Sequence, residues 1–358
     1  MALILLCSSF LISVILTAVV RRWATRVSFV ARPRNDRYHR TIIPMGGGIA
    51  ITATIVLFLL AGIALVHLGA AGWLGNQLAF HAQGFVDKTP QLIVVVIAIG
   101  SLFFMGLADD RKRLGPYGKL AVQFAVAIAA AVFADIRVEL FIPSKIVTTV
   151  LSVLWIVFLI NAFNFLDNMD GLSAGIAWIV TAVLLLAAIQ SGQVFVSALA
   201  LLVLGTLAGY LVFNFPPASI FMGDAGSLVI GFVVAMLSVR TTYYHRESGT
   251  SLYAVFLPLV VMAVPLYDFL SVSFLRIRQG KSPLVGDTQH FSHRLQRRGL
   301  SDKQTVLTLY LATIGTSLGG LLLHDATVVQ AVLIFAQTLI ILTIIAILEA
   351  TGKASGQQ

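Results

Sequence analysis

The chain has 358 residues, of which 58% are hydrophobic and only 11% are charged, whereas soluble domains carry about 25% charged residues. This composition excludes a large soluble domain and predicts a protein that lies mostly within a lipid bilayer. We attribute the formal net charge of +9 to membrane orientation and to the binding of anionic ligands, and we expect no nucleic-acid partner.

Long apolar runs, separated by charged or Gly- and Pro-rich breaks, recur along the whole chain. A helix needs roughly 20 apolar residues to cross a bilayer core of about 30 Å. The predicted helices span residues 2–20, 46–67, 91–108, 119–134, 146–163, 173–190, 193–213, 225–239, 252–275, 305–323 and 327–349. We therefore predict an all-α integral membrane protein, a polytopic bundle of about 11 transmembrane helices, or 10, in a single domain over residues 1–358. Basic residues follow the first run rather than precede it, so we interpret it as a retained span.

The Lys and Arg residues predict the orientation of these helices. When successive connections are assigned to alternate sides, 19 of the 24 Lys and Arg residues fall on one side and 5 on the other. Cytoplasmic loops are enriched in positive residues, so the N-terminus is predicted outside and the C-terminus in the cytoplasm. The cytoplasmic loops then cover residues 21–45, 109–118, 164–172, 214–225 and 276–304. Every unusual polar cluster of the chain falls in or beside these loops.

The third predicted helix ends in two adjacent carboxylates, Asp109 and Asp110, followed by Arg111-Lys112-Arg113. Carboxylates at a helix C-terminus are disfavoured by the helix dipole and by each other. Either the basic run neutralises a solvated turn, or the pair belongs to a metal or phosphate site where a divalent cation removes the repulsion.

The fifth predicted helix ends in a row of oxygen-bearing side chains. Asn161, Asn164, Asp167 and Asp170 recur every three residues, so each lies on nearly the same helix face as the next. Such a row suits Mg²⁺ with its waters, or a ribose. In the alternative reading, Asp170 caps the helix that follows.

Two more polar clusters occur in later inward loops. Asp224 follows Gly223 at the start of the eighth predicted helix, where backbone amides can face an anion while the carboxylate holds a cation. An ordinary turn with an N-cap Asp is the alternative. His290, His293 and Arg294 lie in the loop at 276–304, which either binds phosphates or forms a solvated basic connection.

Two features lie at or within predicted spans. Gly46-Gly47-Gly48 opens the second helix, and small residues there favour close helix packing over chemistry. Asp268 lies inside the ninth helix. An acid inside a membrane segment points to a functional site, but a structural ion pair with Arg276 explains it equally well.

Together these segments resemble the polyprenyl-phosphate N-acetylhexosamine-1-phosphate transferases. The matching motifs follow the family's order along the chain: Arg37-Tyr38-His39 with Pro44 and Gly47-Gly48, Asp109-Asp110 with Lys119 and Gln123, Asn161 to Leu172, Phe221 to Ser227, and Gly280 to Leu295. These separate motifs lie on alternate loops and cover most of the predicted cytoplasmic surface between residues 34 and 298.

The resemblance implies a Mg²⁺-dependent enzyme, with Mn²⁺ as an alternative ion. Such an enzyme transfers N-acetylhexosamine-1-phosphate from a UDP-sugar to undecaprenyl phosphate, or another polyprenyl phosphate, and releases UMP. The product would begin a cell-envelope glycan in the bacterial inner membrane, with the active site on the cytoplasmic face. Membrane lipids are the other expected partners, and a homodimer stays open.

The resemblance also implies roles for residues at the matching positions. Asp224 and Asp110 would bind the metal, Phe221 would stack on uracil, and His290 would assist the pyrophosphate. The implied catalytic residues are Asp109, Asp110, His290 and His293. The implied substrate-binding residues are Arg37, His39, Lys119, Asn161, Asn164, Asp167, Asp170, Asn214, Phe221 and Arg294.

This chain departs from the family's pattern at two positions. Asn168 replaces a glycine of the family's Asp-Gly-x-Asp-Gly motif, and Ser292 replaces the middle imidazole of its His-x-His-His motif. The remaining pattern resembles the glycan-initiating branch more than the peptidoglycan branch. It therefore favours GlcNAc-1-phosphate as the transferred group, with phospho-MurNAc-pentapeptide transfer as the alternative.

The implied reaction joins a lipid phosphate to a pyrophosphate, so both reactants are negative and catalysis depends on positioning and charge neutralisation. A phosphate monoester has a second pKa of about 6, so much of the acceptor is already deprotonated at neutral pH. We favour direct attack, with Asp109 and Asp110 orienting the metal or acceptor, while a phospho-enzyme on Asp109 stays open. A transporter is the competing class, but transporter sites gather near the bilayer midplane, whereas these carboxylates lie at one rim.

Overall fold

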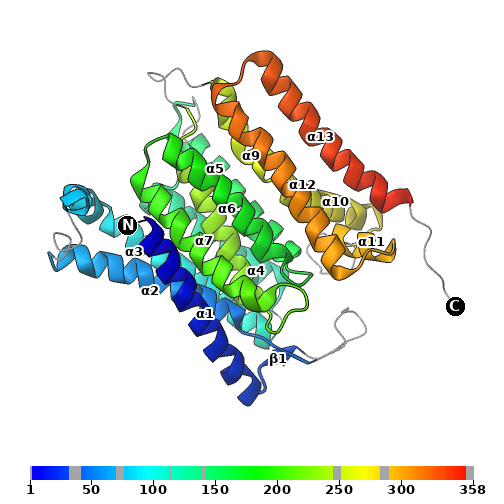
Figure 1. Ribbon diagram of the computed structural model, residues 1–358, viewed down its shortest axis with the longest axis horizontal. Coiled ribbons are helices and arrows are strands. Elements are labelled where there is room, and N and C mark those ends of the chain that lie inside the picture. Colours follow the sequence, from blue (N-terminus) through cyan, green and yellow to red (C-terminus); the bar gives the residue numbers. More distant parts are fainter. Residues whose placement is uncertain are drawn as a thin grey trace.

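A computed structural model describes residues 2–31, 42–69, 76–112, 114–138, 142–244, 251–282 and 290–351. Its helices are α1 (Ala2–Arg26), α2 (Gly47–His67), α3 (Asn76–Arg111), α4 (Pro116–Phe133), α5 (Lys145–Leu166), α6 (Leu172–Gln190), α7 (Val194–Asn214), α8 (Asp224–Arg240), η2 (Leu252–Phe256), α9 (Leu257–Val261), α10 (Ala263–Arg278), α11 (Phe291–Arg297), α12 (Asp302–Leu322), η3 (Leu323–Asp325) and α13 (Val328–Thr351). The strands β1 (Val30–Ala31) and β2 (Ile43–Pro44) pair antiparallel. In Figure 1, α9 to α13 lie together on one side of the remaining helices, with α12 against α6 and α10 against α5.

The structure confirms an all-α polytopic membrane fold. Among the described residues, 9 helices are long and apolar enough to cross a membrane, or 10 if the bent pair Leu252–Val261 and Ala263–Arg278 counts as one span. All the predicted apolar runs are helical. The run at 225–239 forms α8, whose 17 residues are fewer than the roughly 20 that cross a bilayer core. This helix was predicted as a full span; it lies at the short end of the range of about 17–25 residues for a span and is not among the 9 helices counted above.

Two predicted helices differ from the observed ones. α3 begins at Asn76, well before residue 91, and continues through Pro90. The helix predicted at 252–275 is broken, because α10 leaves α9 at an angle of 58°. Pro265 lies in the first turn of α10 and has no N–H to donate to the carbonyl of Val261. The missing hydrogen bond weakens the helix at this point, so a single straight span does not form.

The short helix α8 lies at the centre of the fold, in contact with α2, α3, α5, α6 and α7. Residues 225–238 are all buried. Glycines on two neighbours allow this packing: a Cβ at Gly106 would lie only 2.5 Å from the backbone nitrogen of Ala225, and one at Gly48 would overlap the backbone of Gly226. The prediction that the glycines opening α2 serve helix packing is confirmed for Gly48. The N-terminus of α8 is thereby held against the last turn of α3.

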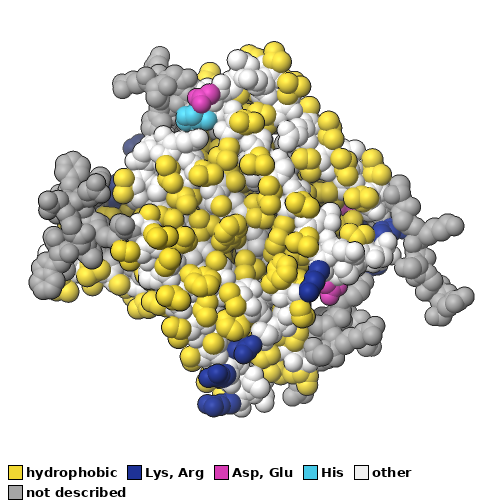
Figure 2. All heavy atoms as spheres, viewed as in Figure 1, with side chains coloured by type: hydrophobic (Ala, Val, Ile, Leu, Met, Phe, Trp, Pro, Cys, Tyr) yellow, Lys and Arg dark blue, Asp and Glu magenta, His cyan; other side chains and the backbone are white. Residues whose placement is uncertain are grey.

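Hydrophobic side chains dominate the broad face shown in Figure 2, and most of the Lys and Arg side chains visible there lie toward one edge. Large apolar side chains are exposed along α1, α10, α12 and α13, among them Leu11, Leu270, Leu311 and Ile340. In water such a surface would drive aggregation, whereas in a bilayer it contacts the lipid chains. The surface therefore agrees with the membrane location that the composition predicts.

Candidate functional site

The end of α3 and the start of α8 meet through Asp110. One carboxylate oxygen of Asp110 accepts a hydrogen bond from the backbone N–H of Asp224 at 2.9 Å, and the other accepts from the N–H of Ala225 at 3.2 Å. The N-terminus of a helix attracts negative charge. The positive end of α8 therefore compensates the carboxylate that the dipole of α3 disfavours, and Asp110 joins two helices that are far apart in the sequence.

Lys119, near the start of α4, lies between two other carboxylates. Its Nζ donates to Oδ2 of Asp109 at 3.0 Å and to Oδ2 of Asp224 through a shorter contact. The remaining oxygen of Asp109 accepts the backbone N–H of Leu114 at 2.6 Å. Asp109, Asp110, Lys119 and Asp224 thus form one cluster, which we call the carboxylate cluster. The reading of Asp109 and Asp110 as a solvated turn neutralised by Arg111 and its neighbours does not account for this arrangement.

The polar row of α5 reaches the carboxylate cluster through Asn164. Its Nδ2 donates to Oδ1 of Asp224 at 3.0 Å and to Oγ of Ser227 at 2.9 Å. One helical turn earlier, Nδ2 of Asn161 donates to Oε1 of Gln123 at 2.6 Å. The Nε2 of Gln123 is a buried donor for which the described part of the chain supplies no acceptor. Of the row, Asn164 thus contacts the carboxylate cluster directly, whereas Asn161 contacts Gln123 of α4.

Asp170, at the end of this row, binds a backbone group of another segment instead of the carboxylate cluster. The cap of α6 is Gly171, with a φ of 71°, and Oδ2 of Asp170 instead accepts the backbone N–H of Ala218 at 2.8 Å. The alternative that Asp170 caps α6 is therefore wrong. Asn214, almost fully buried, accepts the N–H of Gly171 at 3.0 Å and donates to the carbonyl of Ile220 at 2.8 Å. Both side chains tie the α5–α6 connection to the segment that precedes α8.

Phe221 lies in the same segment and pairs through its backbone with the chain before α2. Its N–H donates to the carbonyl of Pro44 at 2.9 Å, and its carbonyl accepts from the N–H groups of Gly46 and Gly47. The ring is half-buried. Arg37 and His39, the two site residues predicted before β2, lie outside the described residues.

α11 carries the predicted histidines and is attached to α10. The Nδ1 of His290 lies 3.0 Å from Oδ2 of Asp268, and the N–H of Phe291 donates to Oδ1 of the same carboxylate at 3.0 Å. Asp268 is fully buried and His290 nearly so. The guanidinium of Arg276 lies over the ring of Phe165, 4.9 Å from its centroid. The two oxygens of Asp268 thus orient His290 and cap α11, which gives this intramembrane acid a role that the sequence left open.

The second histidine of α11 is held in its neutral form. Burial holds the pKa of His293 below its usual value, and His290 and Arg297 lower it further, while the hydrogen bond to Oε1 of Gln296 at 3.1 Å acts in the opposite direction. An imidazole whose pKa lies below the ordinary value of 6.5 is neutral at pH 7. His293 can therefore accept a proton at neutral pH, or donate a single N–H to a ligand.

Arg294 is engaged by the C-terminal helix rather than by the carboxylate cluster. Its Nη2 lies 3.2 Å from Oε2 of Glu349 and donates to Oγ of Ser271 at 2.8 Å. The hydroxyl of Tyr267 also donates to Oε2 of Glu349 at 3.2 Å. Sequence reasoning missed Glu349, although a single acid at the end of the apolar run 327–349 carries the same signal as Asp268.

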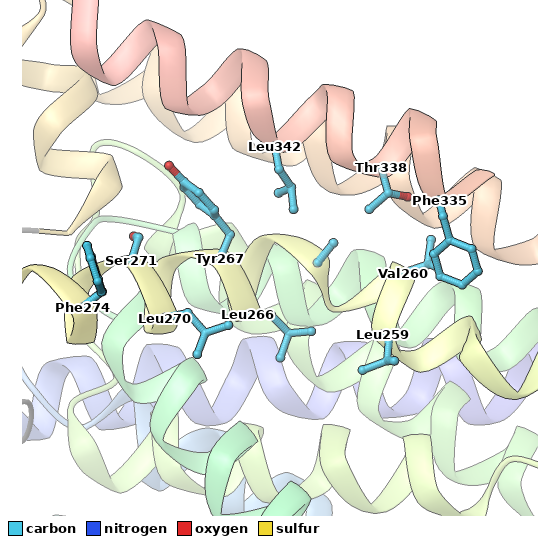
Figure 3. A pocket seen from close by; sticks show the side chains of 11 residues that line it. Leu259, Val260, Leu266, Tyr267, Leu270, Ser271, Phe274, Phe335, Thr338 and Leu342 are labelled. Atoms are coloured by element: carbon cyan, nitrogen blue, oxygen red, sulfur yellow. The ribbon is translucent and has the colours of Figure 1, made fainter. Parts of the chain in front are cut away.

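A cavity of about 460 Å³ separates the middle of α13 from α9 and α10. Figure 3 shows Leu266, Tyr267 and Leu270 lining it from α10, and Phe335, Thr338 and Leu342 from α13. The lining is almost entirely apolar. Beyond this cavity, Glu349 near the end of α13 pairs with Arg294 of α11, so the end of α13 holds α11 in place.

Among the described residues, no group of three His, Cys, Asp or Glu side chains stands in an arrangement that already forms a metal site. The donor chemistry of the carboxylate cluster nevertheless fits a hard divalent cation, because Mg²⁺ takes oxygen ligands. Two of its three carboxylates, Asp109 and Asp224, pair with the one ammonium of Lys119, so the cluster holds more carboxylates than ammonium groups. Asp109, Asp110 and Asp224 are the residues that could hold such an ion.

Comparisons with known proteins agree with this chemistry. The model of the glycosyl transferase family 4 matches residues 92–242, which include the carboxylate cluster and the polar row of α5. Over 352 residues, 96% of this chain and 90% of the relative, the chain is 30% identical to the probable undecaprenyl-phosphate N-acetylglucosaminyl 1-phosphate transferase of Bacillus subtilis. It is 31% identical to the decaprenyl-phosphate N-acetylglucosaminephosphotransferase of Mycobacterium tuberculosis, over 82% of this chain and 76% of that protein. It is 27% identical to the undecaprenyl-phosphate alpha-N-acetylglucosaminyl 1-phosphate transferase of Yersinia pestis, over 85% and 79% of the two chains.

Proposed function

Because the chain belongs to the glycosyl transferase family 4, we propose that it transfers N-acetylglucosamine-1-phosphate from UDP-N-acetylglucosamine to undecaprenyl phosphate or a related polyprenyl phosphate. The transfer releases UMP and leaves the sugar on a lipid pyrophosphate. The relatives from Bacillus, Mycobacterium and Yersinia carry polyprenyl phosphate and N-acetylglucosamine in their names, which supports the acceptor and the transferred group.

The carboxylate cluster is the observation that carries this proposal. Residues from α3, α4 and α8 meet at one end of the helix bundle, and Asn164 of α5 joins them. In a transfer between two phosphates the barrier is mainly electrostatic, so fixed charges that position and neutralise the reactants lower it. A site for a membrane lipid belongs at the end of a bundle, where a lipid headgroup lies. The competing class, a transporter, needs its charges near the middle of the helices.

The metal in this proposal is Mg²⁺, with Mn²⁺ as the alternative, and Asp110 and Asp224 are its main ligands. A bound divalent cation supplies positive charge beside the two phosphate groups. Lys119 adds a second positive group and keeps Asp109 and Asp224 close together. Asn164 holds the carboxylate of Asp224 in its orientation from the side of α5.

The donor nucleotide is proposed to lie on the side of the α5–α6 connection. Asp167 and Phe221 would face the nucleoside, while Asp170 and Asn214 hold the two connecting segments in place. His290 and His293 would face the pyrophosphate from α11. Arg37 and His39 remain proposed ligands of the phosphates, and Arg294 is proposed to position α11, since its Nη2 contacts Glu349 and Ser271.

The proposal is tested by adding radiolabelled UDP-N-acetylglucosamine and undecaprenyl phosphate to the purified protein with Mg²⁺. The expected result is a labelled lipid product, formed together with UMP. UDP-MurNAc-pentapeptide as a parallel donor tests the peptidoglycan alternative. A labelled lipid formed from that donor alone would assign the chain to the other branch, and no product from either donor would refute the transferase proposal.

Direct attack by the acceptor predicts that the enzyme alone does not exchange UMP. Both carboxylate oxygens of Asp109 already accept hydrogen bonds, from Lys119 and from the N–H of Leu114, so this residue is poorly placed to act as a free nucleophile. Without lipid, labelled UMP should therefore not enter UDP-N-acetylglucosamine. With undecaprenyl phosphate present the label should enter through the reverse reaction, which serves as the positive control. Clear exchange in lipid-free enzyme would show that a phospho-enzyme forms.

We propose that the active site lies on the cytoplasmic face of the bacterial inner membrane. Lys145 at the start of α5 and Lys281 after α10 are both exposed and lie on opposite sides in this topology. Cys7, the single cysteine, is exposed and is first replaced by alanine. A membrane-impermeant maleimide should then label Lys145→Cys in intact cells, and Lys281→Cys only in inverted vesicles. Labelling of both variants from the same side would contradict the topology.

A further inference from the structure

One hydrogen bond links the α5–α6 connection to α11 across the candidate site. The hydroxyl of Ser292 donates to Oδ1 of Asn168 at 2.5 Å, although 124 residues separate the two. Ser292 is fully buried, and Asn168 is half-buried. A buried hydroxyl needs a partner, and Asn168 supplies it for Ser292, so this contact fixes the spacing between the two segments.

The amide of Asn168 is held at its other end as well. Its Nδ2 donates to the carbonyl of Phe165 at 2.6 Å, in the last turn of α5, where helix carbonyls lack a partner within the helix. With the oxygen bound to Ser292 and the nitrogen to Phe165, the side chain cannot rotate without losing both contacts. Asn168 therefore joins the end of α5 rigidly to α11.

The residues beside this bond are those proposed to bind the donor. Asp167 precedes Asn168 on the nucleoside side, and His293 follows Ser292 on the pyrophosphate side. Asp268 attaches the same short helix to α10 through His290 and Phe291. The two positions at which the sequence departs from the pattern it resembles are therefore in direct contact with each other.

We propose that Asn168 and Ser292 form a positioning pair that sets the distance between the nucleoside pocket and the histidines. This inference rests on the proposed function and adds a determinant of donor binding to it. The pair touches neither reacting group. The pair affects only ligands that contact both the α5–α6 connection and α11. A nucleotide-sugar contacts both segments, whereas UMP, with a single phosphate, contacts α11 much less.

The test is a double-mutant cycle of Ser292→Ala, Asn168→Ala and the double variant, with the full-length enzyme, UDP-N-acetylglucosamine and undecaprenyl phosphate. Each single variant removes this hydrogen bond and leaves one of its two groups without the partner, which corresponds to about a tenfold effect. We expect each single variant to raise the KM for UDP-N-acetylglucosamine about tenfold, and the double variant to raise it no further than the worse single variant. The inhibition constant of UMP should change by less than about twofold in all three.

Two further variants separate the hydrogen bond from packing. Ser292→Cys fills the site with a slightly larger side chain that is a weaker donor, so its KM should lie between those of the wild type and Ser292→Ala. Ser273→Ala removes a buried hydroxyl of α10 that has no partner among the described residues, and its KM should equal that of the wild type.

The outcomes distinguish this inference from the proposed function. An inactive wild type refutes the proposed function. An active wild type whose single variants keep a normal KM, or whose effects multiply in the double variant, overturns the positioning pair while the function stands. Lowered thermal stability with unchanged KM would show a purely structural bond, and an equal loss of UMP affinity would show a general collapse of the pocket. Either result also overturns the inference.

Discussion

Replacing Asp224 by asparagine should lower turnover by about 1,000-fold, the size of effect seen when a fixed charge-stabilising group is removed from an active site. Asp224 is the residue at which the site converges, because its carboxylate meets Lys119 and Asn164 while its backbone N–H meets Asp110. An amide has nearly the same shape but no negative charge. It can neither balance the ammonium of Lys119 nor contribute a charged ligand to Mg²⁺, so the apparent affinity for Mg²⁺ should fall as well.

The measurement is the initial rate of lipid labelling as a function of Mg²⁺ concentration. Asp135→Asn is the matched control, since Asp135 is also paired with a basic side chain, Arg137, but lies beyond the opposite end of α4. The control should keep wild-type turnover. Near-normal turnover of the Asp224 variant at ordinary Mg²⁺ concentrations would remove this residue from the metal site.

The second large effect is expected at Asp268, where asparagine should lower kcat by about 10- to 100-fold. This range corresponds to the loss of a hydrogen bond to a charged group. The amide oxygen of asparagine can still accept the N–H of Phe291, so the cap of α11 is retained. The amide nitrogen, however, would face Nδ1 of His290 as a donor and reverse the tautomer that the carboxylate selects. Chemistry should therefore suffer more than donor binding, and kcat should fall further than KM rises.

Asp325→Asn is the control for this variant, because Asp325 also lies beside a histidine, His324, but is exposed at the distant end of α12. It should leave kcat unchanged. If the Asp268 variant loses only thermal stability and its folded fraction keeps wild-type kcat, Asp268 has a structural role alone.

Much of this architecture could be predicted from the sequence. The length of the apolar runs predicted a polytopic all-α chain, because crossing a bilayer imposes a length and a composition on each helix. The three-residue spacing of Asn161 and Asn164 placed both on one face of α5, since a helical period is a local property. The pairing of Asp110 with the N-terminus of α8 could not be predicted in this way, because it depends on which helices become neighbours.

The misses have the same physical origin. The alternative that Asp170 caps the next helix rested on a local rule, but Asp170 accepts the N–H of Ala218 in a segment almost 50 residues away. The pairing of Arg294 with Glu349 could not be predicted either, because Glu349 lies at the far end of the chain. Pro265 indicates the bend before α10, but the run was predicted as one straight helix because its residues are almost all apolar. In each case a long-range contact or a single backbone defect outweighed the local pattern.

The burial of α8 has a consequence for how the protein is made. This helix is short, begins with Asp224, ends with Arg240 and is covered over residues 225–238 by its neighbours. A segment of 17 residues with a charge at each end is a poor substrate for insertion into lipid on its own. During synthesis α8 therefore depends on α2, α3, α5, α6 and α7, all of which precede it along the chain, to receive it. A chain that stops before α8 would lack the helix that fills the centre of the bundle. The carboxylate of Asp224 therefore reaches its position only after the helices that contact it have been made.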